Sequence, residues 1–311
     1  MWARLDPPAN RPIDVVSLGE NSLDFVAVME PGHAVAAKRR LRRFDLFSGG
    51  QTATAAVACA RLGLKARYIG AFGDDDWGAR GRRSLEQEGV DLVAISHPRC
   101  PSRIAVVIVD ERGERTVLER RDEALTIEPI PEGAIEAGRL LLVDATDVTA
   151  AQTAVGRART AGIPALVDVD RVDAQIEALL EAIDIIIVPG PFLEAATGVP
   201  DPGLGLIKLT ERYPQASAVV ATLGEEGSLA RVQGREISTA GYRVSVQDTT
   251  GAGDAFRAGF AAAWLRLGPH APIEALLRRA NATAALNCRS VGAQAGLPVR
   301  DEVDRLVTGW P

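Results

Sequence analysis

The chain has 311 residues, of which 47% are apolar and 24% are charged, and its formal net charge is −6. This composition predicts a globular protein, and the negative charge excludes a general electrostatic attraction to nucleic acid or to anionic membranes. Residues 1–12 form a polar tail without the apolar core of a signal peptide, and no apolar run approaches the roughly 20 residues of a membrane helix. The cysteines, Cys59, Cys100 and Cys288, match no disulfide or metal pattern, so we expect a cytoplasmic protein with no nucleic acid or membrane partner.

Short runs of apolar and β-branched residues recur along the chain after this tail. The predicted strands are 13–18, 67–72, 140–143, 165–169, 183–188 and 218–222, and the predicted helices between the later strands are 150–161, 172–182 and 204–213. Such alternation is typical of a mostly parallel sheet with helices on both faces. We therefore expect a Rossmann-like α/β domain over residues 13–311.

Two regions interrupt the alternation of strands and helices. Residues 24–29 continue the first strand and lead into a basic segment that ends near Phe47, while residues 104–109 and 115–119 flank a Gly-containing turn and predict a hairpin. We expect these pieces, about 24–47 and 103–121, to form a small separate β-sheet. Such a sheet beside the strand ends would serve as a lid over a binding site.

The most informative stretch runs from Asp248 to Phe256 and reads DTTGAGDAF. Phe256, Phe260, Trp264 and Leu267 recur at helical spacing, which predicts one apolar helix face and places the start of the helix between Gly251 and Asp254. A helix N-terminus offers unpaired N–H groups and the positive end of the helix dipole, both of which favour a bound anion.

The small residues Gly251, Ala252 and Gly253 would let a transferring phosphoryl group approach these N–H groups closely and so form an anion hole. Asp254 would stand at the edge of the hole as the general base, and we expect the helix dipole to lower its pKa. The stretch is not a P-loop, because the chain lacks a Gly-x-x-x-x-Gly-Lys-Ser/Thr motif.

The DTTGAGDAF string resembles the C-terminal signature of the ribokinase-like (PfkB-type) carbohydrate kinases. In that family the final Asp is the catalytic base and the Gly-Ala-Gly backbone forms the anion hole, which implies these roles for Asp254 and for Gly251, Ala252 and Gly253. The resemblance also implies ATP and Mg²⁺ as cofactors, a sugar-like substrate and, as in many members, a homodimer through the lid.

Gly49 and Gly50 open an alanine-rich helix, and the segment is similar to the family's N-terminal signature, whose Gly-Gly lies against the sugar. The resemblance implies substrate contacts at Gly49, Gly50, Gln51 and Thr54, although the family often has Lys in place of Gln51 and usually has Asn in place of Thr54. These two differences leave the identity of the substrate open.

Asp24 follows Gly19 by five residues, as does the family's Asp that binds sugar hydroxyls, so it is the expected acceptor-side carboxylate. An Asp at the end of a strand can equally cap a turn. Arg103, at the start of the predicted hairpin, is either a further acceptor contact or a solvent-facing residue.

The turn from Thr222 to Gly227 resembles the family's Thr-x-Gly-x-x-Gly segment beside the nucleotide, which implies nucleotide contacts at Thr222, Gly224 and Gly227. Asn281 lies on a late helix that borders the adenine in relatives. Glu194 matches a family residue that organises magnesium through water, with Pro191 in place of the usual Asn.

Three more residues near the end of the chain are candidate contacts for a monovalent cation such as K⁺, because this region forms a cation loop in some relatives. They are Asp248, Thr250 and Ser290.

The motifs together predict an ATP-dependent transfer of a phosphoryl group to a hydroxyl of a sugar or related polyol. A nucleoside kinase is an alternative, although only 5% of the residues are aromatic, and a sugar-phosphate kinase is another, although it needs more basic residues around the acceptor than Arg103. A non-catalytic sugar-binding protein on the same fold is a third alternative, because fold alone does not dictate function.

Overall fold

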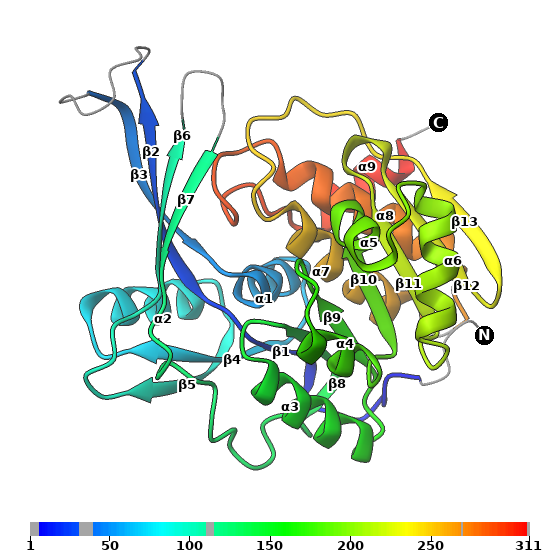
Figure 1. Cartoon of the computed structure of the whole chain (residues 1–311), viewed down its shortest axis with the longest axis horizontal. Coiled ribbons are helices and arrows are strands. Elements are labelled where there is room, and N and C mark those ends of the chain that lie inside the picture. The colour runs from blue at the N-terminus through cyan, green and yellow to red at the C-terminus, as the bar shows by residue number, and fades with distance from the viewer. Residues whose placement is uncertain (1–5, 31–39, 110–114, 269, 310–311) are drawn as a thin grey trace.

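The computed structural model describes residues 6–30, 40–109, 115–268 and 270–309. Its centre is a nine-stranded sheet in the order β13-β12-β11-β10-β9-β8-β1-β4-β5 (Figure 1). The strands from β11 to β5 in this order run parallel, and β12 and β13 add an antiparallel hairpin at one edge. The strands are β1 (Ile13–Leu18), β4 (Ala66–Gly73), β5 (Asp91–His97), β8 (Gly138–Asp144), β9 (Ala165–Asp168), β10 (Ile185–Pro189), β11 (Ala218–Thr222), β12 (Ser228–Val232) and β13 (Arg235–Thr239).

Helices cover both faces of this sheet, because both faces carry apolar side chains that must be removed from water. One apolar core lies under α3, α4, α5 and α6 and includes Ile176 and Leu206, and a second core lies under α1, α2, α7 and α8 and includes Val57 and Phe260. The helices are α1 (Gln51–Arg61), α2 (Asp76–Gln87), α3 (Val148–Thr160), α4 (Ala174–Leu180), α5 (Gly190–Thr197), α6 (Pro202–Arg212), α7 (Ala252–Leu267), α8 (Ile273–Asn287) and α9 (Arg300–Thr308).

A separate four-stranded sheet in the order β3-β2-β6-β7 stands out from the main domain (Figure 1). Its strands are β2 (Ser22–Met29), β3 (Leu41–Gly49), β6 (Ile104–Val109) and β7 (Arg115–Arg120), with β2 parallel to β6 and the other pairs antiparallel. The chain enters β2 directly after β1 and passes from β3 through Gly50 into α1. The base of this sheet therefore lies beside the carboxyl ends of the main strands.

The predicted α/β architecture with a separate small sheet is confirmed, and the predicted strands and helices agree with the structure to within two or three residues. Leu267 corrects the predicted apolar face of α7, because it is 41% exposed while Phe260 and Trp264 are buried. The predicted turn at 110–113 and part of the basic segment before Arg40 lie outside the described residues. Among the described helices, none is long and apolar enough to cross a membrane.

Candidate active site

Polar side chains gather where β1, β8 and β9 reach their carboxyl ends. Asp144 is the last residue of β8 and Asp168 the last of β9, while Glu20 follows β1. Asp144 Oδ2 accepts hydrogen bonds from the Glu20 N–H at 2.7 Å and from the Thr52 hydroxyl at 2.8 Å. This buried carboxyl group thus joins β1, β8 and the start of α1 at the sheet edge where open α/β folds place their ligand sites.

The backbone that leads into α7 is held in a defined turn. Asp248 Oδ1 accepts hydrogen bonds from the Thr250 N–H at 2.9 Å and the Thr250 hydroxyl at 2.7 Å, and Oδ2 accepts one from the Gly292 N–H at 2.9 Å. Asn287 Nδ2 donates to the Thr250 carbonyl at 3.1 Å. Gly251 then adopts a φ of 77°, in the left-handed region that favours glycine, and α7 starts at the next residue.

This turn brings the four predicted catalytic residues together at the N-terminus of α7, namely Gly251, Ala252, Gly253 and Asp254. Unlike Gly251, Gly253 does not have a positive φ, so its backbone conformation does not require glycine. It instead leaves room for Arg257, because an added Cβ would lie 2.9 Å from Nη1 of that residue. The Ala252 N–H donates to the Thr249 carbonyl at 3.2 Å, so the other N–H groups of the first turn, which have no partner within the helix, are the ones suited to bind an anion.

The carboxyl groups of Asp254 and Asp168 lie next to each other, where they can share a hydrogen bond when one of them is protonated, and Oδ1 of Asp168 lies 2.8 Å from Nη2 of Arg257. Burial raises the pKa of Asp168 to about 6, although the charge of Arg257 opposes the rise. Burial, and after it the charge of Asp168, raises the pKa of Asp254 well above its ordinary value. The expectation that the helix dipole lowers the pKa of Asp254 is therefore wrong, because desolvation and a neighbouring carboxylate outweigh the dipole.

The predicted acceptor-side residues Asp24, Gly49 and Gly50 meet at the base of the four-stranded sheet. Asp24 Oδ1 accepts a hydrogen bond from the Ser22 hydroxyl at 2.8 Å, and burial raises the pKa of Asp24. A Cβ on Gly49 would lie 2.3 Å from Asp24 Oδ2, so only glycine lets β3 pass this carboxyl group. Gly50 follows with a φ of 95° and turns the chain into α1.

Gln51 and Thr54 lie on the same helix but in different surroundings. Gln51 Nε2 reaches across the sheet edge to Asp168 Oδ1 at 3.5 Å and Asp170 Oδ2 at 3.4 Å, so Gln51 contacts the carboxyl group that lies beside Asp254. Thr54 is fully buried, and its hydroxyl accepts a hydrogen bond from Gln294 Nε2 at 3.3 Å. The structure thus places Thr54 in the interior between α1 and the segment after α8.

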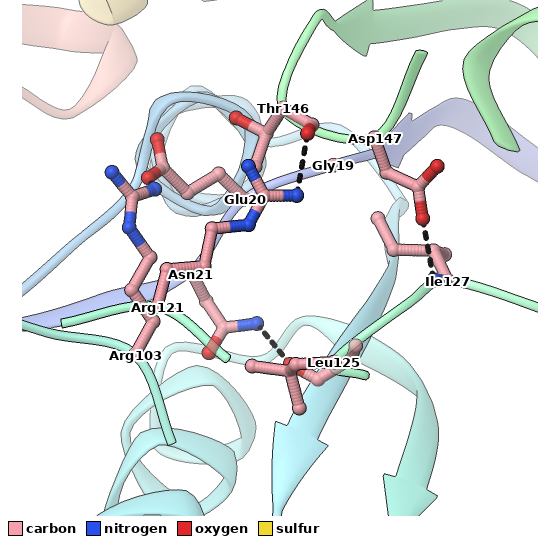
Figure 2. A pocket seen from close by; sticks show the side chains of 10 residues that line it. Gly19, Glu20, Asn21, Arg103, Arg121, Leu125, Ile127, Thr146 and Asp147 are labelled. Atoms are coloured by element: carbon pink, nitrogen blue, oxygen red, sulfur yellow. Dashed lines mark hydrogen bonds and ion pairs between the residues drawn. The ribbon is translucent and has the colours of Figure 1, made fainter. Parts of the chain in front are cut away.

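A small pocket lies beside Glu20, between the base of the four-stranded sheet and the loop after β8 (Figure 2). Arg103 forms an ion pair with Glu20 at its wall, and its Nε lies 2.9 Å from a carboxylate oxygen of Glu119. Arg121 also lines the pocket and donates a hydrogen bond to the Thr146 carbonyl (Figure 2). Arg103 therefore lines this pocket, with two carboxylates balancing its charge, and its contact with an acceptor stays a prediction.

The predicted nucleotide-side residues Thr222, Gly224 and Gly227 lie in the turn that connects β11 to β12. Gly190, the first residue of α5, lies next to this turn, since an added Cβ there would be 3.7 Å from the Thr222 carbonyl oxygen. Glu194 is exposed on the same helix. The start of α5 therefore lies beside the turn, and Glu194 follows four residues later on that helix.

Asn281 is buried, and its Nδ2 lies 3.1 Å from Ser228 Oγ and 3.0 Å from Thr239 Oγ1. The side chain therefore fastens the β12–β13 hairpin to α8, a contact that its position in the sequence does not indicate. Ser290, the third candidate for a cation, lies two residues before Gly292, which bonds Asp248. Asp248, Thr250 and Ser290 thus belong to two adjoining loops.

The comparisons with known proteins agree with this geometry. Residues 13–300 match the family model described as pfkB family carbohydrate kinase. The chain belongs to this family. It is therefore a carbohydrate kinase, and its family phosphorylates sugars in an ATP-dependent reaction.

Individual relatives cover nearly the whole chain. It is 32% identical over 304 residues to an ATP-dependent ribose-1-phosphate kinase of Halopiger xanaduensis, with 94% of this chain and 97% of the relative covered. It is 27% identical to a ribokinase of Bacillus subtilis, with 95% and 99% covered. The structure of Arabidopsis thaliana ribokinase with ribose and ATP superposes with a TM-score of 0.85 at 25% identity, with 95% of this chain and 98% of that chain covered.

Sequence reasoning did not find two buried charged residues of the site, Asp144 and Arg257. Each has a local signal: Asp144 ends an apolar strand, and Arg257 stands between Phe256 and Phe260 in a helix stretch that is otherwise apolar or small. A charged residue in such a stretch is rarely buried unless it is paired, so it indicates an interior partner. The partner itself cannot be read from the local sequence.

Proposed function

We propose that this carbohydrate kinase transfers the γ-phosphoryl group of ATP to a hydroxyl of a sugar or related polyol, with Asp254 as general base and the Gly251–Gly253 backbone as anion hole. The acceptor oxygen bonds to the γ-phosphorus while the bond from that phosphorus to the bridging oxygen of ADP breaks. The hydroxyl proton passes to the Asp254 carboxylate. The N–H groups at the start of α7 stabilise the charge of the phosphoryl oxygens in the transition state.

The observation that carries this proposal is the position of Asp254 in the first turn of α7, next to the anion-binding N–H groups and partly open to solvent. Burial beside Asp168 raises the pKa of Asp254, which makes its carboxylate a stronger base than an ordinary Asp. A base whose pKa lies closer to the working pH accepts a proton more readily.

On the acceptor side, Asp24 and the Gly49–Gly50 backbone support binding of sugar hydroxyls at the base of the lid. The Asp24 carboxylate can accept hydrogen bonds from hydroxyl groups, and glycine at 49 and 50 keeps the approach to it free of side chains. Gln51 would add an amide donor or acceptor beside Asp168. Closure of the lid would exclude water and so limit hydrolysis of ATP.

The turn at Thr222, Gly224 and Gly227 would receive the nucleotide, and Mg²⁺ would enter with its phosphates. The described residues contain no group of three or more His, Cys, Asp or Glu side chains that could hold a metal, which fits an ion bound mainly by phosphate and water. Glu194 is exposed and could contact such an ion through water.

For K⁺, the fitting feature is the Asp248 carboxylate. Its Oδ1 accepts hydrogen bonds from the Thr250 N–H and hydroxyl and its Oδ2 accepts one from the Gly292 N–H, so this anionic oxygen ligand lies where the two adjoining loops meet. Thr250 and Ser290 would supply further oxygen atoms from the adjoining loops.

A second candidate is the kinase of a phosphorylated sugar, because two guanidinium groups, those of Arg103 and Arg121, line the pocket beside Glu20. Guanidinium groups bind phosphate oxygens well. The similarity to a relative named ATP-dependent ribose-1-phosphate kinase supports the same candidate. Arg103 is already paired with carboxylates, so Arg121 would carry most of this recognition.

The test is ADP release from Mg-ATP, measured across sugars, sugar acids, sugar phosphates and nucleosides, with Asp254→Asn as the control. We expect one acceptor class to give turnover that falls about 10²- to 10⁴-fold in Asp254→Asn, with KM little changed. Arg121→Ala should raise KM only if that acceptor carries phosphate. Near-normal turnover of Asp254→Asn would contradict the role of Asp254 as base.

A further inference from the structure

Arg257 is a buried charged residue at the site that has no part in the mechanism above. It lies in the second turn of α7 with 3% of its side chain exposed, and Asp168 is equally buried. Nη2 lies 2.8 Å from Asp168 Oδ1 and donates to the Ile187 carbonyl of β10 at 2.9 Å. Nη1 lies against Gly253, where an added Cβ would come within 2.9 Å. The guanidinium group therefore touches both the anion-binding turn and the residue that bonds Asp254.

The pairing is poorly suited to a purely structural role. Within the described residues, Nε of Arg257 has no hydrogen-bond partner. Oδ2 of Asp168 also has none there when Asp168 and Asp254 are both ionised, and a proton on either carboxyl group would let the two bond each other. Buried ion pairs with incomplete hydrogen bonding contribute little stability and can often be replaced by apolar residues without loss. A charge kept here at such a cost suggests a functional use.

The functional use of this charge would be to offset negative charge at the site. Asp144, Asp168 and Asp254 bring three carboxyl groups to one sheet edge, and the transferring phosphoryl group adds further negative charge. Two adjacent carboxylates cannot both ionise readily without a neighbouring cation. Arg257 offsets this charge from inside the protein, where it needs no movement during the reaction.

We propose that Arg257 is a positioning residue for phosphoryl transfer, which holds Asp168 against Asp254 and places a buried positive charge next to the Gly251–Gly253 turn. This inference rests on the proposed role of Asp254 as base. It also explains Gly253, since any side chain there would displace the guanidinium group.

The experiment compares kcat and KM for ATP and acceptor in Arg257→Met, Arg257→Lys and the double variant Arg257→Met/Asp168→Asn. We expect Arg257→Met to lower kcat about 10- to 100-fold with both KM values within about threefold, because Arg257 is too buried to bind either substrate. Arg257→Lys, which keeps the charge, should recover most of kcat.

The double variant keeps the test decisive if Arg257→Met fails to fold, because it leaves no unpaired carboxylate at 168. We expect it to unfold at a temperature close to that of the wild type and yet to keep the low kcat. A folded double variant with wild-type kcat, or a variant in which only KM rises, would overturn the inference. Arg157→Met is the matched control, since it removes a 2.7 Å ion pair with Glu136 away from the site and should leave kcat unchanged.

Asp254→Asn in the same assay separates the two hypotheses. If Asp254→Asn is inactive while the folded double variant turns over normally, the role of Arg257 fails and the base stands. If Asp254→Asn turns over normally, the proposed base itself fails.

Discussion

Gly251→Ala perturbs the turn that is proposed to bind the phosphoryl group, and the structure gives the expected loss of stability. The residue adopts a φ of 77°, and a non-glycine residue in this region costs about 1–2 kcal/mol. The new Cβ would also lie 2.5 Å from the Ala293 carbonyl oxygen and 2.9 Å from its Cα, so one backbone segment must move. Such overpacking adds about 1–3 kcal/mol, which gives a total loss of roughly 2–5 kcal/mol.

Gly63→Ala is the matched control. Gly63 also has a positive φ, 86°, but an added Cβ there meets no atom within 4 Å. Urea unfolding should therefore show only the backbone cost of about 1–2 kcal/mol for Gly63→Ala, with normal kcat. Gly251→Ala should lose more stability than Gly63→Ala. It should also lose most of its kcat, because the N–H groups at the start of α7 shift. Equal stabilities of the two variants, or normal kcat in Gly251→Ala, would refute this account of the turn.

Two further predictions concern the nucleotide side and the base. Asn281→Ala should lower the unfolding temperature, because it removes the amide that joins α8 to the β12–β13 hairpin. We expect KM for ATP to change less than about threefold. A large rise in KM for ATP at unchanged stability would instead assign Asn281 to the nucleotide. Because burial and the charge of Asp168 raise the pKa of Asp254, and because only the carboxylate accepts a proton, kcat/KM should fall with decreasing pH through a pKa clearly above 3.8. A pH profile whose acidic limb lies at or below 3.8 would contradict this.

The parts of the fold that the sequence predicts are those with local physical causes. The buried strands appear as short apolar runs, and the start of α7 appears because small residues precede a helical pattern. For this reason the sequence alone suffices to group Gly251, Ala252, Gly253 and Asp254 at one helix terminus. The pairing of β6 with β7 follows from a turn signal of the same local kind.

The parts that could not be predicted depend on contacts between distant segments. The side chain of Thr54 bonds Gln294, and that of Asn281 bonds the β12–β13 hairpin. The sequence does not indicate these partners, because they depend on which segments pack against each face of a helix. The predicted direction of the pKa shift of Asp254 was wrong for the same reason. The dipole of α7 is a local property, whereas Asp168 arrives from the end of another strand.

Burial distinguishes the roles of the three carboxyl groups at the sheet edge. Asp144 is fully buried and bound by N–H and hydroxyl donors, so it serves to join β1, β8 and α1. Asp168 is 2% exposed and bound by Arg257, so no substrate hydroxyl can reach it directly. Asp254 alone of the three keeps partial exposure. A general base must lie within hydrogen-bonding distance of the proton that it accepts, so the deeper burial of the other two carboxyl groups supports the proposal that Asp254 is the base.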